Sequence, residues 1–327
     1  MGPTLKMKSY FRNSCKPELS TRSVFILFLV SYERKVDRTL RLSNLLLFLL
    51  LAFLWGTGWS ATKIALSYAS PSSFVLHRFV FSTITMFPAF LVLRKRVPRD
   101  AKTLEKLLLL CSINAFGIMV TNTGLVGESS GMGAVLTYTQ PLFVFCLAVP
   151  FLDERLNVTK FAGAAAGFVG AVLLFLSSIS SLTLASSALM IFGAFLWAVT
   201  VIYYKRLLSH VDSFVTNFFQ WAFGIIPLTA LNLCSSSFFF PQEATYLWMV
   251  IYTAIGSACI GWTIWLYLLR KEDATVVSGS SFIVPLVALF SGWLFLGENM
   301  IIESILGSAL VLLGVFLVNR NSHKNRE

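Results

Sequence analysis

The chain has 327 residues, of which 56% are hydrophobic and only 13% are charged. Soluble globular proteins carry about 25% charged residues, because a charged surface keeps them dissolved. This composition excludes a soluble globular protein and predicts an integral membrane protein, which presents apolar side chains to a hydrocarbon core about 30 Å thick. The formal net charge is +11, but no basic domain with interleaved aromatic residues is evident, so a nucleic-acid partner is not expected.

Residues 1–41 precede the first long apolar stretch and form a basic N-terminal extension. Their apolar segment SVFILFLV, residues 23–30, is too short to cross a bilayer as a helix. It also lacks the longer apolar core and the clear cleavage site of a secretory signal. Two interpretations stay open: a disordered basic extension, with Met7 as an alternative start, and a helix that lies at the membrane interface.

Ten apolar stretches follow, each of about 17 to 25 residues, which is the length of a membrane-crossing helix. Barrel strands are excluded because the stretches are too long and lack alternation of apolar and polar residues. The predicted fold class is an all-α membrane protein with ten transmembrane helices, at residues 42–64, 72–93, 105–125, 131–152, 159–178, 183–205, 212–233, 246–268, 274–296 and 302–319.

Among the connections between these helices, only every second one contains Lys or Arg. The odd-numbered connections contain no basic residue, whereas the even-numbered ones contain RKRVPRDAKTLEK, DERLNVTK, KRLLSHVD and LRKEDA. Basic residues concentrate on the cytoplasmic side of membrane proteins. Both termini are therefore predicted to be cytoplasmic, and this inner-face bias accounts for the net charge.

The two halves of the chain repeat one pattern. TQPLFVFCLAVPFLDERL at 139–156 is similar to IVPLVALFSGWLFLGENM at 283–300, and the constant spacing of 144 residues aligns Pro141 with Pro285 and Glu154 with Glu298. The copies lie five predicted helices apart, in the fourth and the ninth, and an odd number of crossings inverts the second half relative to the first. Inverted halves are the usual scaffold of alternating access. Slightly different spacings align Trp55, Lys63 and His77 with Trp197, Lys205 and Asn217.

Taken together, residues 42–319 resemble the EamA type of the drug/metabolite transporter superfamily. The resemblance is carried by LWGTGWSATKIAL, the HRF segment, SSGMGAVLTYTQPLFVFCLAVPFLDERL, FAGAAAGFVGAVLLFL, FLWAVTVIYYK, ATVVSGSSFIVPLVALFSGWLFLGE and ILGSALVLLGVFLV. It implies an inverted pair of five-helix repeats, at 42–178 and 183–319, followed by a cytoplasmic tail at 320–327. It also implies a central cavity lined chiefly by helices 1 to 4 and 6 to 9, and transport of small metabolites. The superfamily includes sugar-phosphate and nucleotide-sugar carriers, so the substrate stays open.

Polar and aromatic residues inside the predicted helices are the candidate substrate-binding residues. A charge within the bilayer costs about 2.5 to 3.5 kcal/mol, so Lys63, His77 and Arg78 are notable, although Lys63 could instead reach the headgroups. The uncharged candidates could equally hydrogen-bond a neighbouring helix. The full set is Trp55, Ser60, Lys63, His77, Arg78, Asn114, Tyr138, Gln140, Trp197, Thr200, Asn217, Tyr252 and Ser281.

Pro141 and Pro285 fall in the middle of predicted helices, where each removes a backbone hydrogen bond and serves either as a hinge or as a fixed kink. All 15 acidic residues fall in connections, tails or helix ends. A carboxylate deep in the membrane, common in proton and cation antiporters, is therefore not expected.

No catalytic residue, metal site or cofactor is expected, because the five cysteines and three histidines are scattered and no phosphate-binding loop is present. The favoured function is a secondary transporter in the plasma membrane, which exports a small organic metabolite, most simply an amino acid or a related anionic or zwitterionic compound. A sugar-phosphate or nucleotide-sugar carrier is the alternative, and a channel or a membrane enzyme is the alternative class. Apart from substrate and membrane lipid no partner is expected, and both a monomer and a homodimer stay open.

Overall fold

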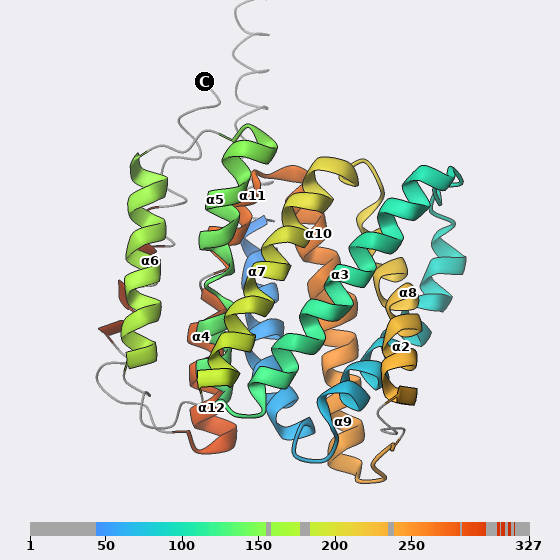
Figure 1. Cartoon of the computed structure of the whole chain (residues 1–327), viewed down its shortest axis with the longest axis horizontal. Helices are drawn as coiled ribbons and strands as arrows, with labels where there is room; N and C mark the ends of the chain where they lie inside the picture. The colour runs from blue at the N-terminus through green and yellow to red at the C-terminus, as the bar shows by residue number, and fades with distance from the viewer. Residues whose placement is uncertain are drawn as a thin grey trace, which may run out of the picture. The chain divides into compact units, whose positions relative to one another are not determined.

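The computed structural model describes residues 44–154, 158–176, 184–234, 239–281, 283–298 and scattered positions between 306 and 317. The chain divides into two compact units, residues 1–46 and residues 47–327. All contacts described below lie within the second unit. Figure 1 labels its helices. The proposed N-terminal extension at 1–41 and the tail at 320–327 lie outside the described residues.

The first half begins with a helix at Asn44–Ala65. Ser70 then caps α2 by accepting from the Ser73 N–H, and Asp100 caps α3 by accepting from the Thr103 N–H. These caps satisfy N–H groups that have no partner inside the helix. The elements are α2 (Pro71–Leu93), α3 (Ala101–Leu125), α4 (Ser130–Thr137), α5 (Gln140–Leu152) and α6 (Val158–Leu176).

The second half repeats this order, with one π-helical segment, η2, inserted between two α-helices. Its elements are α7 (Leu184–Leu207), α8 (Ser213–Cys234), α9 (Ala244–Tyr252), η2 (Thr253–Gly261), α10 (Trp262–Lys271), α11 (Ala274–Ser280) and α12 (Ile283–Leu296). The segments α9, η2 and α10 join into one continuous helix, Ala244–Lys271. The sequence did not predict the π-helical segment.

Nine of the ten predicted helices fall largely within the described residues, and each is helical there. Eight of the described helices are long and apolar enough to cross a membrane, and α6 contributes the shorter apolar stretch Phe161–Gly170. The tenth, predicted at 302–319, lies mostly outside the described residues. The all-α membrane class is thus confirmed, and the count of ten stays a prediction.

Two spans are broken where the sequence places proline. The span Ser130–Leu152 consists of α4 and α5, and the span Ala274–Leu296 consists of α11 and α12. Pro141 and Pro285 have no N–H to donate four residues back, so the helical ladder is interrupted. At both breaks a tighter turn replaces it: the Leu142 N–H donates to the Thr139 carbonyl at 3.0 Å and the Val284 N–H to the Ser281 carbonyl at 2.9 Å.

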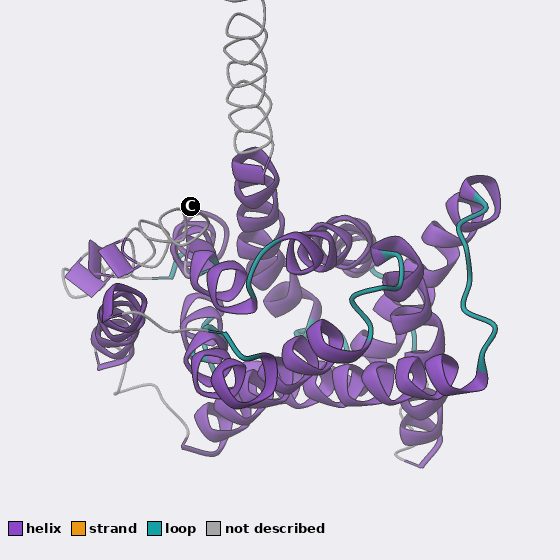
Figure 2. Ribbon diagram, turned by 90° about the horizontal axis from the view of Figure 1, so that it is seen from above, coloured by secondary structure: helices purple, strands orange, loops and turns teal. Residues whose placement is uncertain are grey.

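The broken spans pack against each other. α4 contacts α12, and α5 contacts α11, while α3 packs on α7 and α2 on α8. Every one of these pairs joins an element of the first half to an element of the second. Figure 2 shows the bundle from above, with many of the helices seen close to end-on.

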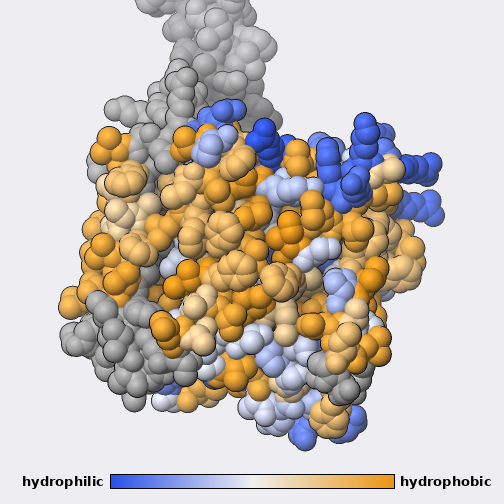
Figure 3. Space-filling model, in the orientation of Figure 1, coloured by the Kyte–Doolittle hydropathy of each residue, from blue (hydrophilic) through white to orange (hydrophobic). Residues whose placement is uncertain are grey.

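The surface shown in Figure 3 is mostly apolar over the length of the helices, with hydrophilic side chains gathered toward the ends. The densest group lies where α2 leads into α3, and the exposed basic residues there are Arg94, Lys95, Arg96, Arg99 and Lys102. A wide apolar band with polar ends is the surface expected of a protein that spans a bilayer.

Candidate functional site

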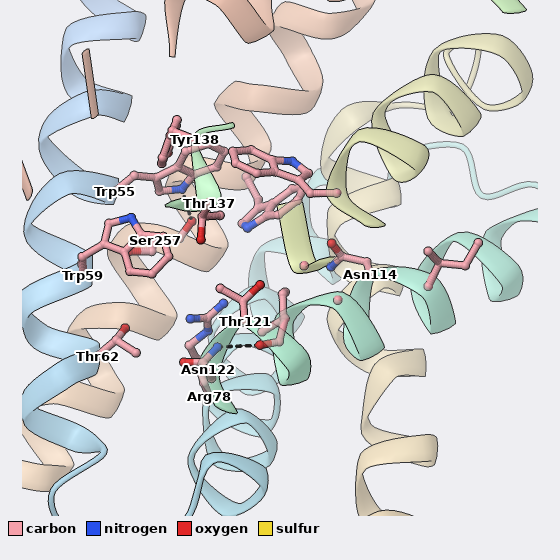
Figure 4. Close-up of a pocket in the computed structure, with 17 residues that line it drawn as sticks. Trp55, Trp59, Thr62, Arg78, Asn114, Thr121, Asn122, Thr137, Tyr138 and Ser257 are labelled. Carbon is pink, nitrogen blue, oxygen red and sulfur yellow. Dashed lines mark hydrogen bonds between the residues drawn. The ribbon is translucent and has the colours of Figure 1, made fainter. Parts of the chain in front are cut away.

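A cavity of about 120 Å³ lies between the helices of the two halves. Its walls come from the first helix, α2, α3, the end of α4, α7, η2 and the start of α10 (Figure 4). The lining residues are Trp55, Gly58, Trp59, Thr62, Arg78, Ile113, Asn114, Gly117, Ile118, Thr121, Asn122, Thr137, Tyr138, Gly193, Trp197, Ser257 and Trp262.

One wall of the cavity is aromatic. The Trp55 ring centroid lies 5.5 Å from that of Trp197 and 5.6 Å from that of Trp262, and Tyr138 meets Trp197 edge to face at 5.4 Å. Trp55 is fixed because its Nε1 donates to the Ser257 carbonyl at 3.0 Å. Aromatic pairs at these separations contribute about 0.5 to 1.5 kcal/mol beyond the burial of their area. The wall is therefore a rigid apolar surface for a ligand.

Arg78 brings a positive charge to the opposite side of this cavity. The residue is 8% exposed, and its Nε has no hydrogen-bond partner. Its guanidinium lies 5.8 Å from the Trp221 ring centroid. Within the described residues, no carboxylate lies at salt-bridge distance from Arg78. The ion pair found among those residues joins Lys95 to Asp212 instead. A buried cation with no carboxylate beside it among the described residues is costly, so this arrangement favours an anionic group of a ligand.

Asn122 also lines the cavity and contributes a hydrogen-bond acceptor to it (Figure 4). Its Nδ2 donates to the Ile118 carbonyl at 2.7 Å, and this bond fixes which atom of the amide is nitrogen. Asn122 Oδ1 is left buried without a partner. The lining of the cavity therefore includes a hydrogen-bond acceptor as well as a positive charge.

Further polar atoms of the lining residues have no hydrogen-bond partner among the described residues. Asn114 Nδ2 and Trp197 Nε1 are buried donors, and Thr137 Oγ1 is a buried hydroxyl oxygen, all without a hydrogen bond. Most buried polar groups in native proteins are satisfied. Polar groups that converge on a mostly apolar cavity can orient a ligand, and these atoms are available for such bonds.

The π-helical segment contributes Ser257 to the lining of the cavity, and Asn217 of α8 donates hydrogen bonds to the backbone of this segment. Asn217 Nδ2 lies 3.0 Å from the Ala258 carbonyl, 3.1 Å from the Cys259 carbonyl and 2.9 Å from Thr263 Oγ1. A π-helix shifts carbonyls out of the regular α-helical ladder. Asn217 therefore stabilises the backbone that carries Ser257 and Trp262 into the cavity wall.

Of the 13 residues predicted to bind substrate, five line the cavity: Trp55, Arg78, Asn114, Tyr138 and Trp197. The other eight lie outside its lining and bond within the protein. They are Ser60, Lys63, His77, Gln140, Thr200, Asn217, Tyr252 and Ser281.

Lys63 shows why a charged side chain within a span need not face the cavity. Its ammonium donates to the carbonyls of Leu125 and Val126 at 3.0 and 2.9 Å. Lys205, its counterpart in the other half, donates to the carbonyls of Leu269 and Glu272, both at 2.6 Å. Both lysines satisfy the last carbonyls of a helix and complement the negative end of its dipole.

His77 faces away from the cavity. Its Nδ1 lies 2.6 Å from the Tyr246 hydroxyl, and its ring packs against Phe240. The neighbouring Arg78 enters the cavity because successive residues on a helix point about 100° apart. The sequence signal was a pair of adjacent basic residues, and only packing decides which one faces inward.

The connection between α3 and α4 contains a buried acidic residue, Glu128, which is 4% exposed. Its carboxylate accepts from Ser187 Oγ at 2.7 Å. Burial raises the pKa of the Glu128 carboxyl, while the Ser187 hydrogen bond and the charge of Lys63 act to lower it. The residue lies outside the cavity lining and the membrane spans.

Comparisons with known proteins agree with this architecture. The sequence model of the EamA-like transporter family matches residues 42–176 and 184–320. An uncharacterised transporter of Archaeoglobus fulgidus is 30% identical over 81% of this chain and 95% of its own length. The uncharacterised transporter YoaV of Bacillus subtilis is 27% identical over 81% of this chain and 92% of its own length.

A protein of Salmonella typhimurium described as a probable amino-acid metabolite efflux pump is 26% identical over 82% of this chain and 92% of its own length. A solved crystal structure aligns with a TM-score of 0.70 and 17% identity, covering 87% of this chain and 99% of the other. At that identity the structural likeness concerns the fold alone.

Proposed function

Because this chain belongs to the EamA-like transporter family, we propose that it is a secondary carrier that exports a small metabolite bearing a carboxylate, most simply an amino acid or a related zwitterion. The carrier would reside in the plasma membrane with both termini in the cytoplasm. The family and the transporter names of the relatives indicate a transporter rather than an enzyme.

The observation that carries this proposal is Arg78, which lines the cavity with no carboxylate at salt-bridge distance among the described residues. A carboxylate bound there would supply the missing acceptor, and charge-assisted hydrogen bonds to a guanidinium are about twice as strong as neutral ones. Asn122 Oδ1 would accept from an ammonium or another N–H of the same ligand. Trp55, Trp197 and Tyr138 would contact its apolar part.

A sugar-phosphate or nucleotide-sugar substrate fits less well. A phosphoryl group carries more charge than a carboxylate and is usually held by several cations or helix N-termini. Among the described lining residues, Arg78 is the one cation. The names of two relatives, in Salmonella typhimurium and Escherichia coli, as probable amino-acid metabolite efflux pumps also favour an amino acid.

In alternating access, the two halves would exchange conformations, so that the cavity opens first to one side of the membrane and then to the other. The aligned breaks before Pro141 and Pro285 would act as hinges, because each is a local interruption of an otherwise helical span. Tyr138 lies at the first of these breaks and also lines the cavity, so a change of angle there would alter the cavity itself.

The test compares matched acid and amide ligands on purified Arg78→Gln protein. If Arg78 binds the carboxylate, the acid should lose about 1.5 to 3 kcal/mol of binding free energy, while the amide changes little. The ligand panel consists of amino acids and their primary amides, measured by calorimetry and by counterflow in proteoliposomes without ATP.

Lys63→Gln is the matched control, because it removes a positive charge that does not line the cavity. It should affect acid and amide equally. Equal losses for both ligands in Arg78→Gln would assign Arg78 to scaffolding, and counterflow no faster than in empty liposomes across the panel would reject the carrier.

A further inference from the structure

Two glutamates tie the halves of the protein together at opposite ends of the same pair of spans. Glu154 follows α5, and its Oε1 accepts from the Ala274 N–H at 2.7 Å. Its Oε2 accepts from the Thr275 N–H at 3.2 Å and from the Thr275 hydroxyl at 2.8 Å. Glu154 thereby binds the start of the span Ala274–Leu296. We name this contact the inner tie.

Glu298 makes the reverse connection. It follows α12, and it accepts from the first N–H groups of the span Ser130–Leu152: Oε1 from Ser130 at 2.7 Å and Oε2 from Gly131 at 3.2 Å. We name this contact the outer tie. Each span thus ends in a carboxylate that binds the beginning of the other span.

These contacts differ from the ordinary helix caps of this protein. Ser70, Asp100 and Ser129 each cap the helix that follows them directly in the sequence. The two glutamates instead cross between the halves, over 120 and 168 residues. Both place a negative charge at the positive end of a helix dipole, where it is stabilising. A capping bond made this way joins one half of the protein to the other, rather than closing one helix.

The ties lie beyond the breaks in the two spans. The outer tie joins α4 to the end of α12, and the inner tie joins α11 to the end of α5, while the breaks and the cavity residue Tyr138 lie between them. Separation of α4 from the end of α12 would break the outer tie and leave the inner tie intact. Separation of α11 from the end of α5 would break the inner tie and leave the outer tie intact.

We propose that Glu298 and Glu154 are positioning residues for transport, each holding one face of the protein closed and each released when the cavity opens to that face. The inference rests on the alternating-access carrier and on the orientation proposed above. Inverted halves that exchange conformations would also exchange which tie is formed. Loss of one tie therefore biases the carrier toward one face.

The test measures access to the cavity from each side of the membrane. Ile118, a lining residue of α3, is replaced with cysteine in a background in which Cys15, Cys146 and Cys234 are serine. A membrane-impermeant maleimide is applied to right-side-out and to inside-out vesicles, and labelling of the background without the reporter is subtracted. The readout is the ratio of the outside to the inside labelling rate.

Glu298→Gln should raise this ratio about tenfold and Glu154→Gln should lower it about tenfold, because a neutral amide forms weaker bonds to helix N–H groups than a carboxylate does. The double variant should return toward the parent ratio. Asp100→Asn is the matched control, since it weakens a carboxylate cap within one half. It should leave the ratio unchanged.

Gly292→Ala provides a second route to the outer tie. A Cβ at Gly292 would overlap Glu298 Oε2 and lie 2.7 Å from Ser130 Oγ, so the added methyl group displaces the carboxylate without altering its charge. This variant should shift the ratio in the same direction as Glu298→Gln. It keeps the test informative where the glutamine variant folds poorly.

Shifts in the same direction for the two glutamine variants, or no shift in folded protein, would overturn the proposal. If the two glutamates have a structural role alone, both variants should be less stable, and the ratio of the outside to the inside labelling rate should not change. Counterflow by the parent protein is measured in parallel, so failure of the ties is distinguished from failure of the carrier function itself.

Discussion

Asn122 contributes a hydrogen-bond acceptor to the cavity that Arg78 also lines. Its Oδ1 is a fixed acceptor because Nδ2 is engaged by the Ile118 carbonyl. Asn122→Asp would add a negative charge to the wall of the cavity that Arg78 lines and would offset the positive charge of the guanidinium. We expect binding of monocarboxylates to weaken at least about tenfold, the equivalent of 1.4 kcal/mol, and amines without a carboxylate to bind better. Calorimetry with acid and amine ligands measures both changes.

Asn114→Asp is the control for this change, because Asn114 lines the same cavity at a distance from Arg78 (Figure 4). It should weaken acid binding less than Asn122→Asp does. An equal effect of the two variants would mean that charge anywhere in the cavity matters, rather than charge beside Arg78.

Among the elements, η2 depends on a neighbour for its conformation. Asn217 of α8 donates to the carbonyls of Ala258 and Cys259, which the π-helical geometry displaces from the regular ladder. Asn217→Leu would leave these buried acceptors without that donor, at a cost of about 1 to 3 kcal/mol. We expect the unfolding midpoint in detergent to fall by about 5 °C and ligand affinity to fall with it, because Trp262 directly follows η2.

Thr263→Val serves as the comparison. It removes the Thr263 hydroxyl, which accepts from Asn217 and donates to the Cys259 carbonyl, and it leaves both contacts of Asn217 with the carbonyls in place. It should lower the midpoint by less than Asn217→Leu. A midpoint unchanged by Asn217→Leu would show that η2 is stable without this amide.

For the molecule as a whole, the distribution of Lys and Arg predicts its orientation. The exposed basic group between α2 and α3 would face the cytoplasm, and the connection before α2 would face outward. A cysteine at Ser67 should react with an impermeant reagent applied to intact cells, whereas a cysteine at Lys102 should react after the membrane is permeabilised. The reverse pattern would invert the proposed topology and exchange the faces assigned to the two ties.

The helices could be predicted from sequence because long apolar runs permit no other structure in a bilayer, where every backbone group needs an internal partner. The breaks in two spans were likewise foreseeable, since Pro141 and Pro285 cannot donate the required hydrogen bond. The π-helical segment could not be foreseen. Its displaced carbonyls are stabilised by an amide 41 and 42 residues away, and no local pattern reports that contact.

The sequence by itself determined the membrane class, the repeat and a short set of polar residues within the spans, because these depend on composition, length and spacing. Tertiary structure decided which of them face the cavity. Arg78 lines the cavity, and its Nε has no hydrogen-bond partner among the described residues, whereas Lys63 donates to the carbonyls of Leu125 and Val126. Both are cations within apolar helices, and their roles differ because helix rotation and the position of neighbouring helix ends determine which acceptors each can reach.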